Sequence, residues 1–274
     1  GDREFLNEKV SFYPKSDTSL PPHAHGETVR DHVTVALYHL IETVGLGEHK
    51  LVRVLDGDWN DAIVINAPDS ANTIRNGESH PNTGMALYIL PKIQKQLKNE
   101  LSSQIHNDID AFVQTISDSF KKEWLGKNDP SKPFYPRGYF YDKGNKPILS
   151  GSKEAHLESQ VWPIIAGFFS ESDNLKNLLS HIDTAIDNPS PIGAFLRKGE
   201  PDIWPAITGL LTWGYALHDR SLAWRSMTRN TLHARAESMP NVWSNIWSAT
   251  DGIHGVKSSN PGIAWSAEST PMKD

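Results

Sequence analysis

The chain has 274 residues, enough to bury a substantial core as one large domain or as two. Its formal net charge is −6 and its Lys and Arg residues are spread along the sequence, so a nucleic-acid-binding surface is not expected. The absence of Cys excludes disulfides and thiolate chemistry and leaves the compartment open, and no apolar run approaches the ~20 residues that span a bilayer.

Helical periodicity and turn residues divide the chain into helices joined by polar loops. After an irregular opening, apolar residues at helical spacing predict a helix over residues 28–44. A polar loop continues through Pro81. Residues 134–141 predict the start of a short strand pair, and residues 142–145 its turn. The last forty residues, rich in Gly, Ser, Pro and Asn, are expected to be mostly loop. Further helices are predicted over 82–97, 101–124, 158–169, 172–187, 203–217 and 221–234.

A short internal sequence similarity indicates repeated helical hairpins. The segment WPIIAG, starting at Trp162, resembles WPAITG, starting at Trp204, 42 residues later. The interval fits one hairpin, with a nearly apolar inner helix and an amphipathic outer one. Pro163 and Pro205 are expected in the first turn of their helices, where the missing N–H would have no partner anyway. The pattern predicts an all-α toroid of helical hairpins.

The segment Gly57-Asp58-Trp59-Asn60-Asp61 gathers two carboxylates, an indole and an amide in five residues. Cleavage of a sugar bond needs a carboxylic acid to protonate the leaving oxygen, and a flat aromatic side chain suits a pyranose ring. Two other interpretations stay open. Asp56, Asp58 and Asp61 could bind a cation, or they could cap a helix that begins near Ala62.

Several segments, in chain order, resemble the catalytic domain of the cellobiose phosphorylase family, glycoside hydrolase family 94. Gly57 to Asp61 carries the specific likeness, followed by Gly77-Glu78-Ser79. The resemblance implies inverting cleavage of a β-glucosidic bond by phosphate. It also implies an all-α, (α/α)6-type toroid, complete or incomplete, here with a short β-hairpin insertion. Weaker likenesses lie at residues 2–10, 159–162, 219–224, 240–242 and 262–265.

The resemblance also implies roles for individual residues. Asp61 is similar to the family's general acid, and Trp59 to the indole that contacts the sugar. We expect Asp61 to be semi-buried beside Trp59 and Asp58, where desolvation and like-charge repulsion would raise its pKa. Asp58 is expected to orient the loop or to bind a hydroxyl group. The other expected substrate-binding residues are Asn60, Arg75, Gln160, Trp162, Trp204 and Trp265.

The chain departs from the family at the phosphate site. Trp204 or Pro205 stands where the family has a phosphate-binding His, and Ala267-Glu268 where it has a Thr-Gly pair. A carboxylate repels phosphate but can activate water, so the sequence favours an inverting hydrolase with Glu268 as base. In such enzymes acid and base lie ~6.5–9.5 Å apart. Phosphorolysis, with Glu268 as an ordinary loop carboxylate, is the alternative. Reserve candidates for the base are Glu158, Glu200 and Asp202.

Residues 1–274 are expected to form a single barrel-type catalytic domain, as a compact relative, as one piece of a processed chain or as the C-terminal part of a larger chain. The expected partners are an oligosaccharide, the N-terminal part of the same barrel or a second copy of the chain. No cofactor is expected. His23 and His25 with Glu27 could bind a metal, but a solvated His-x-His is commoner. A carbohydrate-binding toroid without catalysis is the rival to an enzyme.

Overall fold

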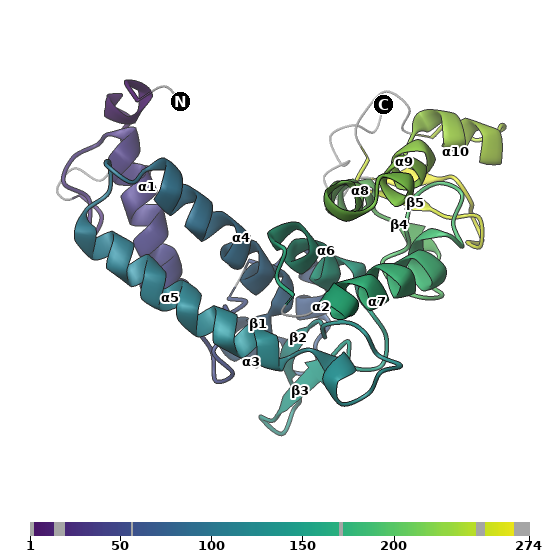
Figure 1. The fold of residues 1–274 in the computed structure, drawn as a ribbon, viewed down its shortest axis with the longest axis horizontal. Coiled ribbons are helices and arrows are strands. Elements are labelled where there is room, and N and C mark those ends of the chain that lie inside the picture. Colours follow the sequence, from purple (N-terminus) through teal and green to yellow (C-terminus); the bar gives the residue numbers. More distant parts are fainter. Residues whose placement is uncertain (1–2, 14–19, 56, 170–171, 245–249, 266–274) are drawn as a thin grey trace. The chain divides into compact units, whose positions relative to one another are not determined.

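The computed structural model describes residues 3–13, 20–55, 57–169, 172–244 and 250–265 (Figure 1). The chain forms two compact units. Unit 1 comprises Gly1–Phe120 and Tyr139–Ile148, and unit 2 comprises Lys121–Gly138 and Leu149–Asp274. Within the described ranges no helix is both long and apolar enough to cross a membrane.

Unit 1 is built on long helices whose buried faces follow the sequence periodicity. The helices predicted over 28–44, 82–97 and 101–124 are confirmed. Thr28 and Asp31 form a capping box at the start of the first helix. On α5, buried apolar side chains recur every three or four residues, and Gln94 of α4 donates hydrogen bonds to α5. The elements are η1 (Phe5–Asn7), α1 (Val29–Tyr38), the π-helix η2 (His39–Val44), α4 (His80–Gln96) and α5 (Ser103–Lys122).

The prediction of a loop through Pro81 is wrong in part, because this segment contains three short elements of secondary structure. They are α2 (Asp61–Ile65), α3 (Ser70–Asn76) and β1 (Glu78–Ser79). The side chain of Asp69 caps α3 by accepting the N–H of Asn72. Apolar residues of α2 and α3 pack with Val54 and Phe140. This tertiary cluster is what stabilises helices too short to give a periodic signal.

The predicted hairpin is confirmed as β2 (Gly138–Tyr141) and β3 (Pro147–Ser150), which form one sheet in the order β1-β2-β3. The Asp142 side chain accepts the main-chain N–H groups of Gly144 and Lys146 and so closes the turn. The chain passes between the two units within β2 and again within β3.

Unit 2 contains η3 (Leu125–Lys127), α6 (Leu157–Ala166), α7 (Ser172–Ile182) with the π-helix η4 (Asp183–Asp187), α8 (Pro205–His218), α9 (Arg220–Arg229) and α10 (Leu232–Ser238). Helix α8 packs against both α6 and α9. Helix α6 is buried along most of its length, as expected for an inner helix. The helix predicted over 221–234 ends at Asn230, and α10 starts anew with Thr231 as its N-cap.

The sequence similarity between the segments starting at Trp162 and Trp204 does not correspond to a structural repeat. Pro205 is the first residue of α8, as expected, but Pro163 lies in the interior of α6. Gly167 ends α6 in the left-handed conformation, with φ of 67°, whereas Gly209 lies inside α8. The similar residues therefore occupy different positions in their helices. The prediction that both prolines lie in the first turn of a helix is wrong.

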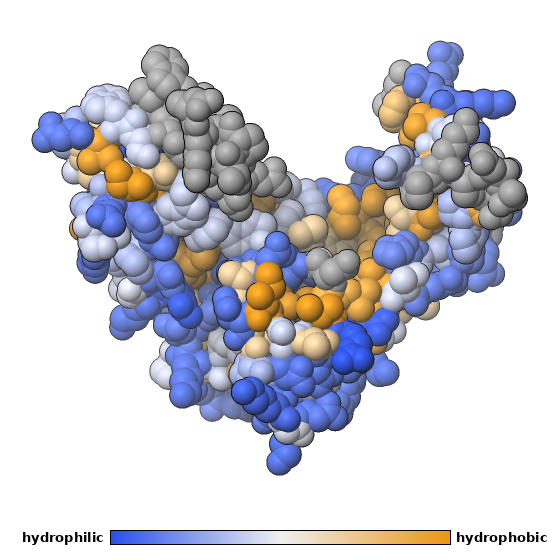
Figure 2. Space-filling view, turned by 180° about the vertical axis from the view of Figure 1, so that it is seen from behind, coloured by the Kyte–Doolittle hydropathy of each residue, from blue (hydrophilic) through white to orange (hydrophobic). Residues whose placement is uncertain are grey.

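The C-terminal region, expected to be mostly loop, contributes two strands to a second small sheet. β4 (Asp202–Ile203) pairs antiparallel with β5 (Gly252–His254), which pairs antiparallel with β6 (Ala264–Trp265). On the surface, hydrophilic residues cover much of the face drawn in Figure 2, with hydrophobic ones gathered in patches. Exposed apolar residues on the helices of unit 2 include Trp213, Leu217, Trp224 and Met227.

Candidate active site

The loop of residues 57–60 is fastened to the start of α4. Asp58 is only 7% exposed. Its Oδ1 accepts the main-chain N–H of Asn60 at 2.9 Å, and its Oδ2 accepts the hydroxyl of Ser79 at 2.7 Å. The side-chain amide of Asn82 donates to the carbonyl of Gly57 at 2.7 Å. Hydrogen bonds from two residues of one junction therefore hold the loop in place, and Asp58 orients it.

Two predicted functional side chains point outward from this fastened loop. Trp59 is 38% exposed and Asp61, the first residue of α2, is exposed as well. The semi-buried setting expected for Asp61 is therefore not found. The expected Asp cap is also wrong, because the side-chain oxygen of Asn60 accepts the N–H of Ile63 and caps α2. Asp56 lies outside the described residues.

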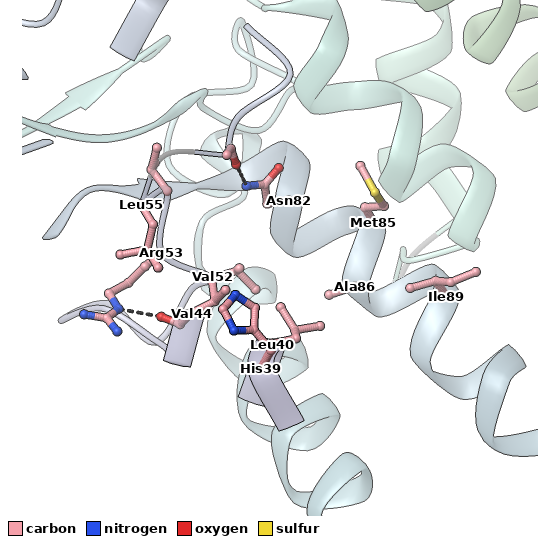
Figure 3. Close-up of a pocket in the computed structure, with 12 residues that line it drawn as sticks. His39, Leu40, Val44, Val52, Arg53, Leu55, Asn82, Met85, Ala86 and Ile89 are labelled. Carbon is pink, nitrogen blue, oxygen red and sulfur yellow. Dashed lines mark hydrogen bonds between the residues drawn. The ribbon is translucent and has the colours of Figure 1, made fainter. Parts of the chain in front are cut away.

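Behind the loop lies a cavity of about 350 Å³. Figure 3 shows His39 and Leu40 of η2 and Met85, Ala86 and Ile89 of α4 around it, with Asn82 bonded to the loop. Arg53 lines it too, but its guanidinium donates to the carbonyls of Thr43 and Val44. A sugar needs hydrogen-bonding groups at its hydroxyls, so this mainly apolar cavity does not suit one. The loop's exposed side is the better candidate.

The other predicted substrate-binding residues lie in different settings. In unit 1, Arg75 is exposed on α3, and its Nε donates to the carbonyl of Ala71. In unit 2, Gln160 is fully buried. Its amide donates to the carbonyls of Tyr135 and His156 and accepts the N–H of Tyr135. Both amide hydrogens of Gln160 are therefore used within the fold, and its side chain presents no exposed surface to a ligand. Trp162 is partly buried within α6.

Glu158, a reserve candidate for the base, belongs to a buried ion pair. Its Oε1 accepts the guanidinium N–H of Arg137 at 2.9 Å, and the two side chains are 2% and 0% exposed. Burial alone would raise the pKa of Glu158, but hydrogen bonding from His156 and the charge of Arg137 bring it below its usual value. The Oε2 atom is also buried, so almost none of this carboxylate is accessible to an attacking water.

The remaining predicted residues gather around the second sheet. Trp204 and Trp265 contact each other edge to face, with ring centroids 5.8 Å apart. Asp202 accepts a hydrogen bond from His254 at 2.6 Å. Glu200 pairs with Arg197 at 2.5 Å. The predicted base Glu268 lies outside the described residues.

Sequence reasoning missed the anchors of the loop and the hydrogen-bond partners of the candidate carboxylates. Ser79 was visible only as part of the Gly-Glu-Ser motif, and nothing in the sequence links His254 to Asp202, 52 positions earlier. His23 pairs with Glu42 at 2.8 Å. Across the described ranges no three His, Asp or Glu residues are grouped as metal ligands would be.

A family model described as the glycosyl hydrolase 94 superfamily, catalytic domain, matches residues 1–200. The chain belongs to this family. Its helix-rich fold with small antiparallel sheets agrees with the helical toroid expected for glycosyl hydrolase 94 catalytic domains.

Two relatives come from Paenibacillus borealis. Solabiose phosphorylase is 27% identical over 193 residues, which are 69% of this chain and 22% of that protein. The 3-O-beta-D-glucopyranosyl-beta-D-glucuronide phosphorylase is 26% identical over 196 residues, with the same shares of each chain. The match thus spans about a fifth of the length of these glycosyl hydrolase 94 relatives.

Proposed function

We propose that this chain carries the general acid of an inverting enzyme that cleaves a glycosidic bond. The observation that carries the proposal is the loop of residues 57–60, fastened at both Asp58 and Gly57 while Trp59 and Asp61 face outward. Trp59 is the surface for a sugar ring, and Asp61 is the proton donor. Family membership supports this assignment of roles.

In the proposed reaction Asp61 gives its proton to the glycosidic oxygen as the bond to the anomeric carbon breaks. The leaving sugar departs as an alcohol, and the acceptor's oxygen attacks the anomeric carbon from the opposite face, which inverts its configuration. A β-linked gluco-oligosaccharide is the proposed substrate. Phosphate is the favoured acceptor, because both relatives are named phosphorylases.

Water is the second candidate acceptor, and the residue Glu268 supports it. Phosphate gives a sugar 1-phosphate and one free sugar, whereas water gives two free sugars. An acidic residue near the acceptor would disfavour phosphate and could take a proton from water. The two acceptors thus differ in product and in their dependence on Glu268.

The test is product analysis with β-linked gluco-oligosaccharides, with and without phosphate, for the unchanged chain and Asp61→Asn. Removing a general acid should lower cleavage roughly 100- to 10,000-fold while leaving oligosaccharide binding intact. Asp118→Asn, an exposed Asp on α5, is the matched control and should keep full activity. Undiminished cleavage by Asp61→Asn would refute the proposal, and a chain that binds without any turnover would support the carbohydrate-binding rival.

The same reactions, with and without phosphate, identify the acceptor. Sugar 1-phosphate formed only with phosphate, and unaffected by Glu268→Gln, is the expected result for phosphorolysis. Free sugars formed equally without phosphate, and lost in Glu268→Gln, would instead establish hydrolysis.

A further inference from the structure

The sheet of β4, β5 and β6 separates its side chains into two chemically different faces. Ile203 lies opposite Ile253, which lies opposite Ala264, and all three are buried.

On the other face, Asp202 lies opposite His254, and Gly252 lies opposite Trp265. Because successive side chains of a strand alternate between faces, the second set points away from the core. Trp204, two residues after Asp202, follows it onto this side. We call Asp202, Trp204, His254 and Trp265 the β4–β6 face.

Asp202 fixes the orientation of the His254 ring. Its carboxylate accepts the Nδ1 hydrogen at 2.6 Å, and the two side chains are 25% and 33% exposed. A neutral imidazole that donates through Nδ1 presents a lone pair at Nε2. Among the described residues no group is hydrogen-bonded to that nitrogen. The pairing with Asp202 thus holds Nε2 of His254, an acceptor in the neutral imidazole, in a fixed direction.

One indole lies against the His254 ring, and a second indole meets the first. The centroids of the His254 and Trp265 rings lie 4.5 Å apart, and Trp204 meets Trp265 edge to face. The Trp265 indole lies over Gly252, where any Cβ would overlap the ring. Flat apolar rings next to an oriented hydrogen-bonding group match the chemistry of a sugar, which has an apolar face of C–H groups and a rim of hydroxyls.

We infer that the β4–β6 face is a subsite for one glycosyl unit, with the sugar packed on the tryptophans and one hydroxyl donating to Nε2 of His254. The inference rests on the proposed function, because it takes the ligand of this face to be a sugar of the class that the proposed reaction cleaves. His254 touches the sugar and determines specificity, while Asp202 is a positioning residue.

Other ligands fit the face less well. The carboxylate of Asp202 would repel phosphate or another anion. One His and one Asp are fewer ligands than a structural or catalytic metal takes from a protein. In the part of the chain that the structure describes, no hydroxyl binds His254 as the nucleophile of a catalytic triad would.

The experiment is calorimetric titration of the 274-residue chain carrying Asp61→Asn with cellobiose, laminaribiose and chitobiose. His254→Ala should weaken binding about tenfold, the equivalent of one lost hydrogen bond. His254→Gln, which keeps an acceptor near the position of Nε2, should restore most of the affinity. Asp202→Ala should weaken binding, and Asp202→Asn, which still accepts from Nδ1, should recover it. Trp265→Ala should weaken the affinity for the disaccharide about tenfold or more.

Matched controls come from the same unit. His233→Ala removes a His paired with an acid, Glu237, on α10, and Trp224→Ala removes an exposed Trp on α9. Neither should change the affinity. The inference is overturned if the face variants bind like the controls, or if none of the disaccharides binds the starting chain at tens of millimolar. The proposed function fails by a different measurement, namely cleavage activity that persists in Asp61→Asn. The two failures can therefore be told apart.

Discussion

Asp187 is a buried carboxylate without a hydrogen bond to its side chain among the described residues. It ends η4, and its two carboxylate oxygens and the nearby Tyr215 hydroxyl are all buried and without such a partner. Burial raises the pKa of Asp187 to about 6, an effect that the charges of Arg229 and Arg225 only partly offset. Asp183, which pairs with Arg225, adds a smaller repulsion.

This residue should make the stability of the fold depend on pH. A carboxyl whose folded-state pKa is raised contributes stability below its unfolded value, and loses it as the pH rises through about 6. Asp187→Asn replaces it with a neutral group of the same shape. The unfolding free energy of Asp187→Asn, relative to the unchanged chain, should therefore rise by about 2 kcal/mol between pH 4 and pH 7.5. Urea unfolding at both pH values measures this difference, and an unchanged difference would contradict the assignment.

At the scale of elements, α6 and α8 approach closely because α8 has Gly at the contact. A Cβ on Gly214 would lie 2.9 Å from Cγ2 of Ile164 on α6. Ile164 and Leu211 are completely buried nearby in these helices. The same helix contains Gly209, where a Cβ would meet nothing within 4 Å.

These two glycines give a matched pair of substitutions. Gly214→Ala should destabilise the chain by about 1–3 kcal/mol, because the added methyl group overpacks the contact between α6 and α8. Gly209→Ala should stabilise it by up to about 1 kcal/mol, since Ala favours a helix and nothing obstructs its side chain. Thermal or urea unfolding of both variants tests the contact. Equal effects of the two substitutions would show that α6 and α8 are not packed in this way.

The elements also show what the sequence could predict. Long amphipathic helices such as α5 follow directly from buried residues at helical spacing. The short α3 did not, and α2 was anticipated only as a helix beginning near Ala62 that an Asp could cap. Both depend on side-chain caps and on distant apolar partners. Within the candidate site, the five-residue motif identified the loop, but the anchor from Ser79 and the pairing of β4 with β5 are long-range contacts. Periodicity carries no information on such contacts.

At the scale of the whole molecule, the two units share continuous elements of secondary structure. The chain crosses from one unit to the other inside α5, inside β2 and inside β3. Unit 2 holds only Lys121 and Lys122 of α5, but each unit holds part of both strands of the β2–β3 hairpin. Unfolding either unit would therefore leave part of a two-stranded hairpin without its packing, and such a hairpin is marginal by itself in water. The connectivity thus favours cooperative unfolding of residues 1–274 as one domain.

We therefore predict a single unfolding transition. Ile109→Ala, at a completely buried position of α5 in unit 1, should lower the unfolding free energy by about 2–5 kcal/mol. Gly214→Ala changes unit 2 instead. Both variants should shift the same midpoint, with far-ultraviolet circular dichroism and tryptophan fluorescence giving coincident curves. Two transitions, each moved by only one of the variants, would mean that the units fold as separate domains. The prediction of one catalytic domain over the chain would then be wrong.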